Sequence, residues 1–93
     1  MRSTNIGKFL VADHMLRFEP DLVAEVFARL KIVPVRIESL WQDLIWEYTA
    51  LSSWFAEVPV GDCVPTYLLI LERDAGGKLV DVVVERAQKR KSI

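Results

Sequence analysis

The sequence is poor in cysteine and histidine, the residues that most often bind metals or act as nucleophile and base. Its 93 residues include one cysteine, Cys63, and one histidine, His14. A single cysteine cannot form a disulfide within the chain, so nothing points to an oxidising compartment and we expect a cytoplasmic location. The histidine has no second histidine one helical turn away and no cysteine cluster, so it forms no zinc motif. We expect no metal and no cofactor.

Long apolar runs are also missing. No run approaches the roughly 20 apolar residues that a membrane-spanning helix needs, which predicts no membrane segment. The apolar group at residues 9–12 ends at Asp13 and is too short for the core of a signal peptide.

Lysine and arginine are absent between Ile37 and Glu72. The same stretch holds six acidic residues, all three tryptophans and both tyrosines. Contacts to phosphate need Lys and Arg, so this stretch is not suited to gripping a polyanion. The segregation predicts instead that it supplies much of the core and an acidic, aromatic-rich surface.

The composition predicts one domain, residues 1–93, that associates with itself. The chain is 52% hydrophobic and its formal net charge is −1. A domain of this size buries only roughly 60–65% of the surface that its unfolded chain exposes. The surplus apolar side chains must stay exposed or be covered by another subunit, which favours a homo-dimer or a higher homo-oligomer.

The clearest local signal is a helix at residues 20–31. Pro20 suits the first helical position, where its missing N–H costs nothing, and Asp21 lies near the positive end of the helix dipole. An apolar stripe follows at helical spacing. Residues 5–17 are ambiguous: Asn5 could cap a second short helix, although Gly7 weakens it.

Four segments have strand character: 32–38, 44–51, 67–72 and 79–86. The sequence Asp-Ala-Gly-Gly at 74–77 predicts a hairpin turn between the last two. Residues 67–72 are apolar on both faces, which is typical of a strand covered on both sides. We therefore expect an α+β fold, in which an N-terminal helix, or two, packs on a four-stranded antiparallel β-meander. The sheet face left uncovered is the expected subunit interface.

The sequence does not indicate an enzyme. Cys63 has no basic neighbour to lower the pKa of its thiol, and Ser52 and Ser53 lack the flanking glycines of a nucleophile elbow. Carboxylates such as Glu47 and Glu57 could act as an acid–base pair only if a cleft joined them.

The connector at residues 52–65 is the expected site for a protein partner. Pro59, Gly61 and Pro65 break regular structure there, and one helical turn could form at 52–55. Two adjacent large rings in an irregular segment cannot easily both point inward, and exposed rings make good interface anchors. The predicted partner-binding residues are Trp54, Phe55, Glu57 and Asp62.

One basic cluster offers an alternative function. It could bind nucleic acid through Arg86, Lys89, Arg90 and Lys91. We favour a solubilising tail and expect no nucleic acid partner, because four charges attract weakly and no aromatic residue follows Tyr67 to stack on bases. We expect residues 1–5 and 88–93 to be flexible.

Residues 47–67 follow the pattern EYTALSxxFxEVPxG…PxY. This pattern resembles one found in small uncharacterised proteins of phages and prophages. The resemblance implies a viral or prophage accessory protein, without an activity attached. Together with the composition, it leads us to expect a small non-enzymatic protein-interaction module.

Overall fold

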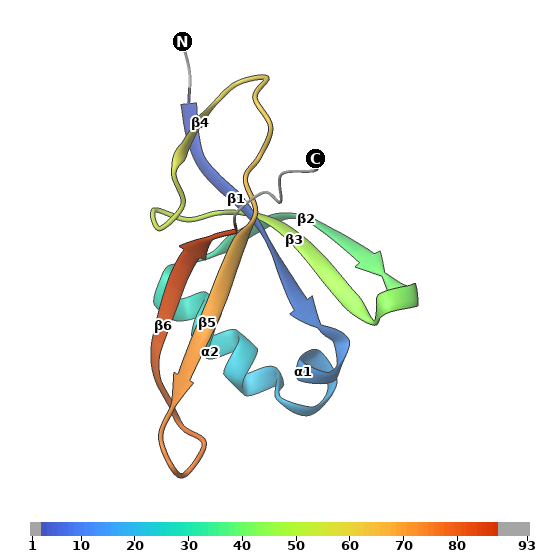
Figure 1. Cartoon of the computed structure of the whole chain (residues 1–93), viewed down its shortest axis with the longest axis vertical. Coiled ribbons are helices and arrows are strands. Elements are labelled where there is room, and N and C mark those ends of the chain that lie inside the picture. Colours follow the sequence, from blue (N-terminus) through green and yellow to red (C-terminus); the bar gives the residue numbers. More distant parts are fainter. Residues whose placement is uncertain (1–2, 88–93) are drawn as a thin grey trace, which may run out of the picture.

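A computed structural model describes residues 3–87, and it shows six strands and two α-helices in that range (Figure 1). In chain order the elements are β1 (Ser3–Ala12), α1 (Asp13–Phe18), α2 (Pro20–Leu30), β2 (Val33–Leu40), the 3₁₀ turn η1 (Trp41–Asp43), β3 (Ile45–Leu51), β4 (Glu57–Pro59), β5 (Tyr67–Arg73) and β6 (Leu79–Arg86). No helix in this part of the chain is long and apolar enough to cross a membrane.

The expected fold, helices on a four-stranded meander, is wrong. The protein is mostly sheet, and its strands form two antiparallel sheets rather than one. The larger sheet has the order β2-β3-β1-β4, and β5 and β6 form a separate two-stranded hairpin. The sheets meet at Lys8, whose N–H donates to the Pro65 carbonyl at 2.9 Å. A four-stranded sheet exists, but its members differ from those expected.

The first segment of the chain is a central strand, not a helix. Gly7, Phe9 and Val11 are buried on one face of β1, and Lys8 and Leu10 point to the other. The apolar residues of this segment fit both helical spacing and strand alternation, so the pattern alone did not decide. Of the residues expected to be flexible, 3–5 pair with β4; residues 1–2 and 88–93 lie outside the described range.

The helix predicted at residues 20–31 is confirmed as α2. It begins at Pro20 and ends at Lys31, which has a left-handed backbone conformation (φ 50°). Val26 and Leu30 point into the core. The Arg29 guanidinium donates to the carbonyls of Leu79 and Val80, at 3.0 and 2.8 Å, and so ties α2 to β6.

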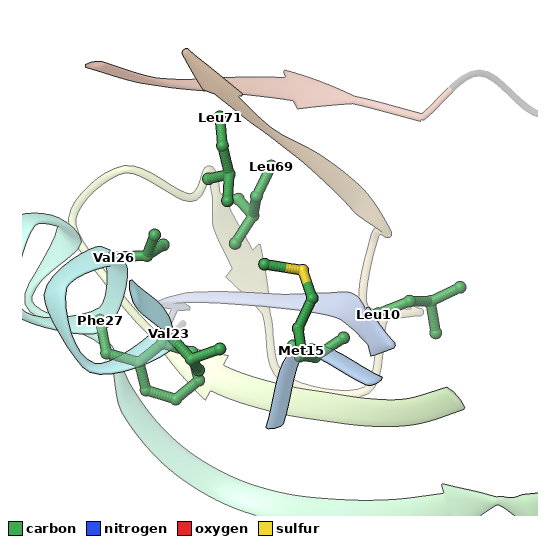
Figure 2. A pocket seen from close by; sticks show the side chains of 8 residues that line it. Leu10, Met15, Val23, Val26, Phe27, Leu69 and Leu71 are labelled. Atoms are coloured by element: carbon green, nitrogen blue, oxygen red, sulfur yellow. The ribbon is translucent and has the colours of Figure 1, made fainter. Parts of the chain in front are cut away.

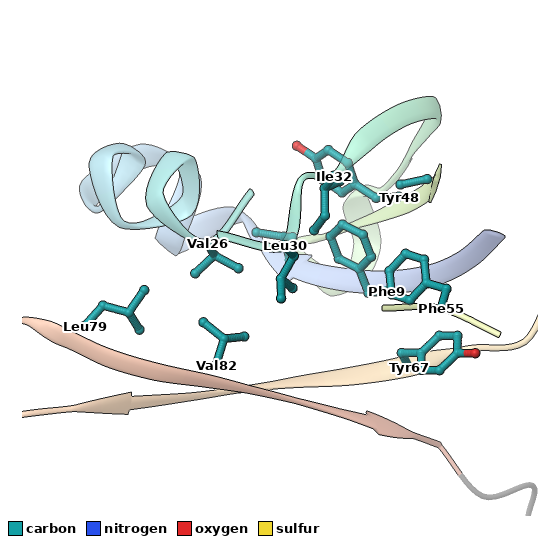
Figure 3. Close-up of a cluster of buried hydrophobic side chains, with 11 residues drawn as sticks. Phe9, Val26, Leu30, Ile32, Tyr48, Phe55, Tyr67, Leu79 and Val82 are labelled. Atoms are coloured by element: carbon teal, nitrogen blue, oxygen red, sulfur yellow. The ribbon is translucent and has the colours of Figure 1, made fainter. Parts of the chain in front are cut away.

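The core lies between α2 and the two sheets (Figure 3). Phe9 stacks on Tyr48 with ring centroids 5.4 Å apart, and burial raises the pKa of the Tyr48 hydroxyl. In Figure 3, Val26 and Leu30 face Val82 on the hairpin. The helix is therefore held against the hairpin and against the larger sheet at once.

Candidate interaction surfaces

Ser52 fixes the start of the connector. Its buried hydroxyl donates to the Leu30 carbonyl at 2.6 Å and accepts from the Trp54 N–H at 3.2 Å. The Phe55 N–H donates back to the Ser52 carbonyl at 3.0 Å, which closes a turn at 52–55 rather than a helix. The end of α2 and the connector are thus joined through one side chain.

The turn separates the two large rings. Trp54 is 58% exposed, whereas Phe55 is 1% exposed and packs between Phe9 and Tyr67. The Asn5 side-chain amide donates to the Phe55 carbonyl at 2.8 Å, which holds this arrangement. Phe55 is therefore a core residue and cannot contact a partner from its place in this fold. The sequence predicted both rings as partner-binding residues; the burial of Phe55 depends on the turn geometry and on packing against Phe9 and Tyr67.

Glu57 and Asp62 are exposed, as a partner surface requires. Glu57 lies in β4 opposite Asn5, and the Asp62 N–H donates to the Pro59 carbonyl at 3.1 Å. Among the described residues, no hydrogen bond or ion pair joins them to each other or to Trp54. The predicted site is therefore a set of separate exposed side chains around the connector, not a preformed cleft.

The proposed acid–base pair is not assembled. Glu47 pairs with Leu10 and Glu57 with Asn5, two β1 positions that alternation places on opposite faces of the sheet. His14 packs against Phe18, and Cys63 is exposed. Within residues 3–87 no group of three or more His, Cys, Asp and Glu side chains could hold a metal ion.

Of the basic cluster, only Arg86 lies in the described range. It is exposed at the end of β6. Lys89, Arg90 and Lys91 fall outside that range, so their role stays a prediction.

The structure shows a surface that the sequence did not single out, the strand β2. All eight of its residues are exposed, and it forms one edge of the larger sheet. In the described chain no hydrogen bond reaches its outer edge. Three of its apolar side chains are at least half exposed: Val33 at 57%, Val35 at 55% and Ile37 at 50%. Pro34 cannot donate to a ladder, which is typical of an edge strand, but nothing in the sequence showed that the strand would be left uncovered.

The opposite edge of the larger sheet is better protected. β4 is only three residues long and ends in Pro59. Short edge strands and prolines are usual means by which proteins prevent unwanted strand pairing.

A second uncovered apolar surface is the outer face of the β5–β6 hairpin. The apolar side chains on this face are exposed: Leu68, Ile70 and Val83. The prediction that β5 is covered on both sides is therefore wrong, because only one side is covered. The acidic residues on the same face, by the strand register, are Glu72, Asp81 and Glu85. The face is therefore apolar in the middle and negative around it.

An apolar cleft lies between α2, β1 and β5 (Figure 2). It encloses about 360 Å³, including the space at its open mouth, and Met15 projects across it toward Leu69. Its lining is wholly apolar: Leu10, Val11, Met15, Val23, Val26, Phe27, Leu69 and Leu71. With no polar group to orient a ligand, the cleft has the character of incomplete packing between the two sheets rather than of a specific site.

Comparison with family models, with curated proteins and with solved structures finds no match to this chain. The resemblance to small phage and prophage proteins therefore stays a prediction.

Proposed function

We propose that this protein is a small non-enzymatic interaction module that associates with itself through β2. The observation that carries the proposal is the free edge of this strand, on which every residue is exposed and three apolar side chains are at least half exposed. An unprotected edge presents a row of backbone donors and acceptors that another strand can pair with. Pairing would also bring the exposed Ile37 against a second copy, and so reduce the apolar surface that the composition leaves uncovered.

The connector supports a second contact of the same module, with a different protein. Trp54 is exposed on a turn that Ser52 holds in place, and exposed tryptophans on fixed backbone are common interface anchors. Glu57 and Asp62 give the surrounding surface a negative charge, which suits a basic partner. A role as a phage or prophage accessory protein is compatible with such a module and rests on the resemblance alone.

Size-exclusion chromatography with light scattering tests the self-association. We expect a dimer at micromolar concentration, and a monomer for Ile37→Lys, which places a charge on the apolar part of the edge. Val60→Lys is the matched control, because Val60 is 74% exposed in the connector and lies outside β2. A wild-type chain that stays monomeric at high concentration would remove the proposal.

A further inference from the structure

The alternation of β2 restricts how two copies of this strand can pair. Arg36 aligns with Thr49 and Glu38 with Glu47, on the sheet face that carries Lys8. Ile37 aligns with Tyr48, on the opposite face, which α2 covers farther in. Residues that oppose each other across a strand pair share a face. A two-fold axis between antiparallel copies must therefore place one residue opposite the same residue of the second copy. That residue then lies at the axis.

Charge then selects among the three central residues of the strand, Arg36, Ile37 and Glu38. An axis at Arg36 places Arg36 opposite its own copy, and an axis at Glu38 does the same for Glu38, so both bring like charges together. An axis at Ile37 places each Arg36 opposite a Glu38 of the second copy. On this axis residues 36–38 of the two copies oppose each other in regular alternation.

The surroundings of Glu38 favour the same arrangement. Within one chain Glu38 lies directly opposite Glu47 on β3, and like charges at such positions repel. Arg36 of the same strand forms an ion pair with Glu38. Arg36 of a second copy would approach Glu38 from the free edge and complete a four-charge cluster across the axis.

The features that protect β2 lie at one end of the strand. Pro34 lacks an N–H, and the register shift between Pro34 and Arg36 is a bulge in the pairing with β3. With the axis at Ile37, the bulge and Pro34 come alongside Ser39 and Leu40 of the second copy, at the margins of the contact. The regular pairing between the two copies is therefore residues 36–38.

We infer that two copies join through antiparallel β2 strands with Ile37 on the two-fold axis, so that the two larger sheets become one eight-stranded sheet. This inference rests on the proposed self-association and adds its geometry. The hairpin face does not serve the same purpose, because two copies would bring Glu72, Asp81 and Glu85 against the same residues.

Disulfide trapping tests the register. Cys63 is the only cysteine and is exposed, so the test uses a Cys63→Ser chain. Directly opposed residues have Cα atoms roughly 4.5–5.5 Å apart, within the roughly 4.4–6.8 Å between the Cα atoms of a disulfide, so Ile37→Cys should form a covalent dimer under mild oxidation. Ser39→Cys is the matched control on the same face: its counterpart lies four residues along the strand, roughly 13 Å away, and should not cross-link.

Charge exchange tests the ion pairs independently. Arg36→Glu and Glu38→Arg each place like charges opposite each other twice per dimer and should weaken dimerisation roughly tenfold or more. The double exchange restores opposite charges and should recover the wild-type dimerisation constant. Lys78→Glu makes the same charge change as Arg36→Glu in the β5–β6 turn and should have no effect.

The outcomes separate the two proposals. Cross-linking at Ile37 but not at Ser39, with recovery in the double exchange, supports the register. A stable wild-type dimer without Ile37 cross-linking, or one indifferent to the charge exchanges, overturns the register and leaves self-association standing. A wild-type monomer overturns both.

Discussion

At the scale of single residues, Gly7 allows two aromatic side chains to rest directly on β1. A Cβ at this position would lie 2.7 Å from Tyr67 Cδ2 and 2.9 Å from Phe55 Cγ. These rings stack on each other with centroids 4.7 Å apart, so neither can easily move aside. In the sequence, Gly7 made a helix at residues 5–17 less favourable. In the structure, its missing side chain lets Phe55 of the connector pack on the central strand β1.

Gly7→Ala should therefore destabilise the fold by about 1–3 kcal/mol, the usual cost of forcing an extra methyl into a packed core. Urea unfolding followed by tryptophan fluorescence measures the change. Gly76→Ala is the control, because its Cβ would meet only Asp74 Oδ1, at 3.4 Å. Equal stability of Gly7→Ala and wild type would show that the contact is not tight.

At the scale of elements, the sequence predicted the features that depend on neighbouring residues alone, namely the start of a helix and a turn. α2 begins at Pro20 as expected, and the 74–77 turn joins β5 and β6 as expected, because a proline and a pair of glycines act on their own neighbours. β4 is three residues long and is formed only by pairing with β1. The choice of partner strand is made by packing across the chain, which is why the sequence did not show that β5 and β6 leave the larger sheet.

For the candidate site, too, the sequence predicted local properties but not those that depend on distant residues. Exposed acidic residues at Glu57 and Asp62 agree with the polarity of their segment, but the burial of Phe55 depends on Phe9 and Tyr67, which are distant in sequence. The free edge of β2 was not predictable either, since a strand's exposure depends on what the rest of the chain leaves uncovered.

Two carboxylates connect the helical segment to both sheets. Asp13 accepts from the Trp46 indole at 3.0 Å, and this bond and the Arg17 guanidinium lower the pKa of its carboxyl against a smaller opposing effect of burial. Glu19 forms an ion pair with Arg73 at 2.8 Å, which lowers the pKa of Glu19. One carboxylate contacts β3 and the other β5, at the two ends of α1.

Acidification should remove these contributions. A carboxyl whose pKa is lower in the folded state stabilises the fold above its unfolded pKa, about 4, and loses that effect as the pH falls through the folded pKa. Asp13→Asn should therefore be less stable than wild type at pH 7, with a smaller difference at pH 3, in urea unfolding at both pH values. Glu19→Gln should behave alike. A difference for Asp13→Asn that does not depend on pH would mean that the carboxylate charge is not what stabilises α1.

At the scale of the whole molecule, the chain leaves apolar side chains exposed on two separate surfaces, β2 and the outer face of the hairpin. The two differ in charge: β2 carries both signs in a self-complementary order, and the hairpin face carries acidic residues alone. Opposite charges are what the proposed pairing of two β2 strands needs, and the hairpin face does not offer them. The proposed dimer would therefore leave the hairpin face uncovered.

Association that is linked to folding should make the thermal stability depend on concentration. Because dimerisation stabilises only the folded state, each tenfold rise in protein concentration should raise the Tm by about 3–5 °C for a domain of this size. Differential scanning fluorimetry from about 2 to 200 μM would measure it. Ile37→Lys should abolish the dependence and unfold at one Tm, below the wild-type values, while remaining folded at room temperature, since Ile37 is half exposed and contributes little to the core. A wild-type Tm that is constant across this range would show that the folded chain gains nothing from a second copy.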